Sequence, residues 1–134
     1  MKTINLDLNS VKTSISIYEK GVDTVPEEIK AISAVKSFLS PKRNWAAMFV
    51  CEEPTQEQRK MNVAILISVK SIQDFNFHEF TRRLSNNIIR TARKGLTTQQ
   101  RKSVKNTESF YRTLVFDKIE SELLEEHTVG KRVH

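Results

Sequence analysis

One segment of the chain concentrates positive charge. Between Phe80 and Lys105 there are eight lysines and arginines and no aspartate or glutamate, whereas the whole chain has 22 basic and 16 acidic residues. The remaining residues therefore include 14 basic and 16 acidic side chains and carry a net charge of −2, although the chain as a whole carries +6. Charge segregated in this way indicates a polyanionic or acidic binding partner.

The spacing of these cations predicts one basic helix face. At about 100° per residue, four polar residues fall within an arc of roughly 60°: Arg83, Asn87, Arg90 and Lys94. Arg82, Asn86 and Arg93 lie beside that arc, and apolar residues lie opposite it, namely Phe77, Leu84, Ile88 and Ala92. Arginine and lysine neutralise phosphates, arginine can bind guanine with two hydrogen bonds, and asparagine can do the same with adenine.

Three more cations follow Gly95 and are expected to open the last helix. Positive charge at a helix N-terminus opposes the helix dipole, and a local rule broken without evident gain suggests a function. We therefore predict a nucleic-acid-binding surface made by nine residues: Arg82, Arg83, Asn87, Arg90, Arg93, Lys94, Arg101, Lys102 and Lys105.

Two alternatives compete with this interpretation, and a helix-turn-helix is one form that nucleic-acid binding could take. A plainly solvated helix face is common, but such faces usually mix both signs of charge. An acidic protein or a membrane surface could bind the same cations. A helix-turn-helix would place the turn at residues 94–97, which has about the right length but lacks a clear apolar pattern.

No catalytic or metal-binding pattern stands out. Three histidines, His78, His127 and His134, have no neighbours at metal-ligand spacing. Glu52, Glu53 and Glu57 lie in one loop and Asp74 follows the next strand, but the strand at residues 61–69 contains no carboxylate of the kind that a nuclease core usually has. No phosphate-binding loop or nucleophile elbow is present. We therefore expect no enzymatic activity, no cofactor and no metal.

An aromatic strand face offers a different binding surface. Trp45, Ala47, Phe49 and Cys51 alternate, so on a strand their side chains would share one face. Such a face could stack on bases, but a hydrophobic core is the favoured interpretation. Cys51, the single cysteine, is then expected to be a small core residue.

Two hairpins and two helical regions must position these groups. Residues 3–8 and 11–18 alternate around Asn9-Ser10, which predicts a hairpin with a two-residue turn. Residues 24–27 resemble a helix start capped by Thr24, and the helix ends at Ser40-Pro41. Residues 45–51 and 61–69 are apolar and predict a second hairpin.

The second half of the chain is predicted to be helical. Asp74 or Asn76 caps the basic helix, and Gly95 follows its end. Thr97 to Gln100 resembles a capping box, and the last helix either runs unbroken or breaks near Asn106-Thr107. The expected fold is an α+β domain of order β-β-α-β-β-α-α, with two antiparallel hairpins in one sheet and helices on one face.

Length and composition suggest a single domain at residues 1–130, followed by a basic tail at 131–134. No apolar run is long enough to span a bilayer, so a cytoplasmic location is expected, without a membrane partner. A homodimer is expected because the last helix has apolar residues outside its apolar strip, so that its apolar surface exceeds what one face of the sheet can cover. The strip comprises Tyr111, Leu114, Val115, Ile119 and Leu123, and the residues outside it are Phe110 and Leu124.

Taken together, these patterns predict a small non-catalytic nucleic-acid-binding protein. It would be a regulatory or accessory factor, as in a mobile element or phage. DNA is the first expected partner, and RNA is an alternative. The competing hypothesis is a protein–protein adaptor or inhibitor that presents the same basic face to an acidic partner.

Overall fold

The computed structural model describes residues 1–40, 46–68 and 77–132, with side chains described at 1–40, 46–68 and 78–123. It is an α+β fold, as predicted. The strands are β1 Lys2–Leu8, β2 Val11–Glu19, β3 Ala47–Glu52 and β4 Lys60–Ile67. The α-helices are α1 Glu27–Lys30, α2 Ser33–Phe38, α4 Phe77–Ala92, α5 Thr98–Val104 and α6 Glu108–Arg132, and the 3-10 turns are η1 Arg93–Gly95 and η2 Lys105–Thr107.

The four strands form one sheet in the order β1-β2-β4-β3. Both predicted hairpins are antiparallel, but β2 and β4 are parallel, with Ile15 opposite Val63. The expectation of a purely antiparallel sheet was therefore wrong. Residues 63–67 of β4 are all buried, and a strand that is apolar on both faces is most stable in the middle of a sheet. β4 consequently lies beside β2, and β3 takes the edge.

The turn of the first hairpin contains no glycine. Asn9 and Ser10 both have positive φ angles, 54° and 69°, as a type I′ turn requires. The backbone N–H of Ser10 donates to Asp7 Oδ1 at 2.8 Å. Asparagine tolerates the left-handed region better than most residues, and the aspartate bond stabilises the tight turn.

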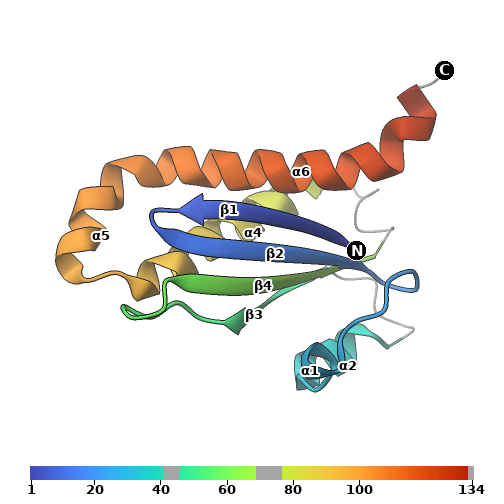
Figure 1. The fold of residues 1–134 in the computed structure, drawn as a ribbon. Helices are drawn as coiled ribbons and strands as arrows, with labels where there is room; N and C mark the ends of the chain where they lie inside the picture. The colour runs from blue at the N-terminus through green and yellow to red at the C-terminus, as the bar shows by residue number, and fades with distance from the viewer. Residues whose placement is uncertain (41–45, 69–76, 133–134) are drawn as a thin grey trace.

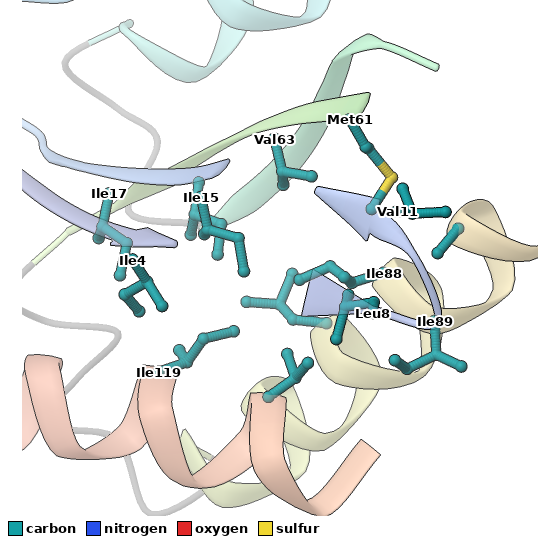
Figure 2. Close-up of a cluster of buried hydrophobic side chains, with 14 of the residues drawn as sticks. Ile4, Leu8, Val11, Ile15, Ile17, Met61, Val63, Ile88, Ile89 and Ile119 are labelled. Carbon is teal, nitrogen blue, oxygen red and sulfur yellow. The ribbon is translucent and has the colours of Figure 1, made fainter. Parts of the chain in front are cut away.

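Helices cover both faces of the sheet, so the prediction that they pack on one face was wrong (Figure 1). On one face, α4 and α6 bury the larger core, which includes Leu8, Ile15, Met61, Ile88 and Ile119 (Figure 2). On the other face, α1 and α2 cover a smaller cluster that includes Tyr18, Phe38 and Leu66. β2 and β4 carry apolar side chains on both faces, and burying the second set removes additional apolar surface from water.

The region predicted as one helix after Thr24 is two short helices. The residue preceding α1 is Pro26, and no side chain caps that helix, so the role predicted for Thr24 was wrong. Ile32 is extended, with ψ of 125°, which separates α1 from α2. The break keeps Ile29, Val35 and Phe38 all directed into the smaller core.

The capping box predicted at the start of α5 is confirmed. Gln100 N donates to Thr97 Oγ1 at 3.1 Å, and Thr97 N donates to Gln100 Oε1 at 2.8 Å. The chain breaks at η2, so Arg101 and Lys102 lie on α5, Lys105 lies in η2, and none of them opens the last helix. α6 instead begins with Glu108, whose negative charge suits the helix dipole.

Gly95 is required for close packing and not for a positive φ angle, which it does not have. A Cβ atom at Gly95 would lie 2.8 Å from the Cβ atom of the buried Pro54 and 3.3 Å from its carbonyl carbon. The end of α4 is therefore pressed against the loop between β3 and β4.

Some predictions fall outside the described part of the chain. The expected helix caps Asp74 and Asn76 lie there, as does Trp45. α6 continues through Gly130 to Arg132, so the first two residues of the expected basic tail are helical.

Candidate nucleic-acid interface

The orientation of α4 agrees with the sequence. Arg83, Asn87, Arg90 and Lys94 are exposed, whereas Leu84 and Ile88 are 4% and 0% exposed. The apolar side of α4 packs on the sheet, and the basic side lies at the surface.

Acidic residues from outside the basic segment partly neutralise this surface. Arg82 binds the Glu79 carboxylate through both Nη2 and Nε, at 2.5 and 3.2 Å. Arg83 Nε lies 3.4 Å from the same carboxylate. The Arg82 hydrogen bond, together with the two positive charges, outweighs desolvation and lowers the pKa of Glu79; the same bond raises the pKa of Arg82.

Arg93 joins the end of α4 to the start of α6. Its Nε and Nη1 lie 3.1 and 3.2 Å from the two carboxylate oxygens of the buried Glu108. Arg101 Nε donates to the Arg93 carbonyl oxygen at 3.2 Å, which connects α5 to the same junction. Arg93 therefore holds three helical segments together. Lys94 also has an acidic neighbour, Glu53, at 3.2 Å, but both side chains are exposed and such pairs contribute little stability.

A groove lies between α4 and α6. Its volume is about 650 Å³, and four arginines line it: Arg82 and Arg90 from α4, Arg93 from η1 and Arg112 from α6. Its other lining residues are Ser85, Asn86, Ile89, Ser109, Thr113 and Phe116. The cations that flanked the predicted arc therefore face α6 across this groove, whereas Arg83, Asn87 and Lys94 do not line it.

Two of the groove arginines lack an acidic partner. In the part of the chain that the structure describes, no carboxylate lies within ion-pair distance of Arg90 or Arg112. Arg82 and Arg93, by contrast, are each bound by a carboxylate. Arg90 and Arg112 are consequently the groove cations most available to an external anion.

Sequence reasoning missed Arg112. It lies outside the acid-free segment, with Glu108 and Asp117 nearby in sequence. Ser109, Arg112, Thr113 and Phe116 follow the i, i+3, i+4, i+7 pattern of one helix side, a signal that was present in the sequence. That this side of α6 lines a groove follows only from the packing of α6 beside α4.

The remaining predicted cations lie next to the groove and do not line it. Arg101, Lys102 and Lys105 are all exposed. Arg101 is tied to the end of α4 through the Arg93 carbonyl, so α5 extends the positive surface beyond the groove.

His78 links the start of α4 to the middle of α6. Its Nδ1 lies 2.7 Å from Glu120 Oε2, and its ring stacks on Phe116 with centroids 6.0 Å apart. Among the described residues, no three His, Cys, Asp or Glu side chains come together in a way that could hold a metal ion.

The placement predicted for Cys51 was wrong. It is exposed, because the β3–β4 register shifts between Val50 and Glu52 and leaves Cys51 without a partner residue. Desolvation by neighbouring atoms raises the pKa of its thiol, which favours the weakly nucleophilic protonated form. Ala47 and Phe49 pack against the smaller core, as the favoured core interpretation predicted.

Comparisons with protein-family models, with curated proteins and with solved structures find no match for this chain. Among the described helices, none is both long and apolar enough to cross a membrane. A function must therefore be inferred from the side chains of α4, α5 and α6.

Proposed function

We propose that the protein binds nucleic acid through the basic surface of α4 and its groove with α6, as a non-catalytic regulatory or accessory factor. The observation that supports the proposal best is the convergence of four arginines from α4, η1 and α6 on one groove. Arg101, Lys102 and Lys105 extend the positive charge on α5 and η2. Phosphates distributed along a polynucleotide match cations distributed in this way.

Hydrogen-bonding groups favour nucleic acid over an acidic protein as the partner. Asn86 lies within the groove, and Asn87 lies on the exposed side of α4. Amide side chains can read base edges, whereas a carboxylate-rich partner needs only cations. Glu79, Glu53 and Glu108 already bind part of the basic surface, so phosphates must compete with internal carboxylates.

Binding should be measured by fluorescence anisotropy with duplex DNA, single-stranded DNA and RNA over a range of salt concentrations. If roughly six or more phosphates are contacted, affinity should fall about 10³-fold between ~50 and ~200 mM salt. Replacing Arg83 and Arg90 by alanine should weaken binding.

Replacing the exposed Lys12 and Lys36, which lie on β2 and α2, removes the same charge elsewhere and should have little effect. Absence of binding to all three nucleic acids at low salt, together with binding to a polyglutamate peptide, would support the adaptor hypothesis instead.

The homodimer stays a prediction, and the structure leaves less exposed apolar surface on α6 than the prediction assumed. Val115, Ile119 and Leu123 are buried in the core of the monomer, and Phe110 is 65% exposed. Phe110 is therefore the main described apolar side chain on α6 that is left for a partner. Light scattering should give a dimer mass that decreases on dilution. A monomer mass at every concentration would rule the dimer out.

A further inference from the structure

We infer that the groove between α4 and α6 is a nucleotide-sized site for single-stranded nucleic acid, in which Arg90 and Arg112 bind a backbone phosphate and Phe116 contacts a base. This inference rests on the proposed function and adds to it the strandedness of the ligand and a specific site.

The anion site is defined by which arginines are already bound. Glu79 and Glu108 each take two hydrogen-bonding groups of one arginine, Arg82 and Arg93 respectively. Arg90 on α4 and Arg112 on α6 have no such partner among the described residues. Both line the groove, so a phosphate there can accept hydrogen bonds from the two guanidinium groups together.

The neutral lining suits the rest of a nucleotide. Ser109 and Thr113 come from α6 and Asn86 from α4. The Thr113 hydroxyl donates to the Ser109 carbonyl at 3.1 Å, which leaves its oxygen lone pairs as acceptors. Asn86 offers an amide that can both donate to and accept from a base edge.

Phe116 supplies an aromatic ring in the same groove. This ring stacks on that of His78, whose Nδ1 lies 2.7 Å from Glu120 Oε2. Single-strand binders combine cations that follow the backbone with aromatic side chains that contact bases. The groove has both.

The shape of the groove favours a single strand over a duplex. Helical duplex readers insert one protruding helix into a major groove about 12 Å wide. α4 and α6 lie side by side (Figure 1), and two packed helices span roughly 20 Å. The groove arginines therefore cannot enter a major groove, whereas a volume of about 650 Å³ lies within the usual range of small-ligand sites.

The test compares a fluorescein-labelled 15-residue oligothymidine with a hairpin duplex of equal charge, by anisotropy at ~50 mM salt. The parent protein should bind the single strand at least ~10-fold more tightly. Arg112→Gln should weaken single-strand binding by about 10-fold and reduce the magnitude of the salt slope by about 0.7. Phe116→Leu should weaken it by about 5-fold or more with an unchanged salt slope.

Lys118→Gln is the matched control. Lys118 is an exposed cation on the same helix, about 120° around the axis from Arg112, and it does not line the groove. Its replacement should change affinity by less than about 2-fold. Because Arg112 is half-buried, thermal melts should accompany each variant. The exposed Arg90→Gln provides a second test that does not depend on how Arg112 affects folding.

The outcomes separate this inference from the proposed function. Equal or tighter duplex binding, or Arg90→Gln and Arg112→Gln variants that bind like Lys118→Gln, would overturn the groove site and leave nucleic-acid binding intact. If the protein binds neither of the two oligonucleotides nor RNA, both the groove site and the proposed nucleic-acid binding would be overturned. Selective loss of single-strand binding in the two arginine variants would support both.

Discussion

Ile88→Ala should destabilise the protein by about 2–5 kcal/mol, because it leaves a cavity that the packed core cannot fill. Ile88 is fully buried and lies among Leu8, Ile89 and Ile119 in the core beneath α4 and α6 (Figure 2). Replacing Arg83 and Arg90 by alanine should change stability by about 0.5 kcal/mol or less per residue. Arg83 contacts Glu79 only in an exposed pair, and Arg90 has no acidic partner among the described residues.

Urea unfolding of the parent, Ile88→Ala and the double arginine variant would measure these differences, with equal m-values as the check on two-state behaviour. The effects of the two variants on nucleic-acid binding should be in the opposite order to their effects on stability. The arginine variant should lose affinity for nucleic acid while remaining folded, and Ile88→Ala should retain binding well below its melting temperature. An arginine variant less stable than Ile88→Ala would mean that α4 faces the other way.

Features set by nearby residues could be predicted from the sequence. The β1–β2 hairpin follows from strict alternation, and the Thr97–Gln100 capping box follows from two residues three positions apart. The burial of Leu84 and Ile88 opposite Arg83 and Arg90 follows from helical periodicity. Each depends on contacts within one element or between adjacent ones.

Long-range packing could not be predicted in the same way. The parallel pairing of β2 with β4 and the covering of the second sheet face by α1 and α2 depend on how distant apolar surfaces are shared. The groove depends on α6 lying beside α4, which alone makes Arg112 a neighbour of Arg90. Periodicity identifies the faces of a helix but does not tell which element each face meets.

In the folded protein, the basic segment has acidic neighbours that its sequence does not show. It contains no acid between residues 80 and 105, yet Glu53, Glu79 and Glu108 each bind one or more of its cations. Charge runs in a sequence therefore overstate the free positive charge. What distinguishes individual cations is the presence of a carboxylate from another element, which only the fold supplies.

Arg59→Met should lower stability by about 2–4 kcal/mol, an effect that no sequence pattern predicts. The Arg59 guanidinium donates to three backbone carbonyls: Nη2 to Asn9 at 3.2 Å, Nε to Ser10 at 3.3 Å and Nη1 to Gly95 at 3.2 Å. It thereby ties the β1–β2 turn to the segment that follows α4. Hydrogen bonds from a charged group contribute roughly 1.5–3 kcal/mol each, and partial access of water to these carbonyls reduces the sum.

Methionine keeps most of the aliphatic side chain, so the loss should reflect the hydrogen bonds more than packing. Lys60→Met is the control, because it removes an exposed cation from the next position and should cost within about 0.5 kcal/mol. Arg59→Lys should be intermediate, since one ammonium group cannot reproduce the planar fork that reaches three acceptors. In thermal melts, Arg59→Met should unfold about 5–15 °C below Lys60→Met. Equal melting temperatures would mean that water replaces all three bonds without cost.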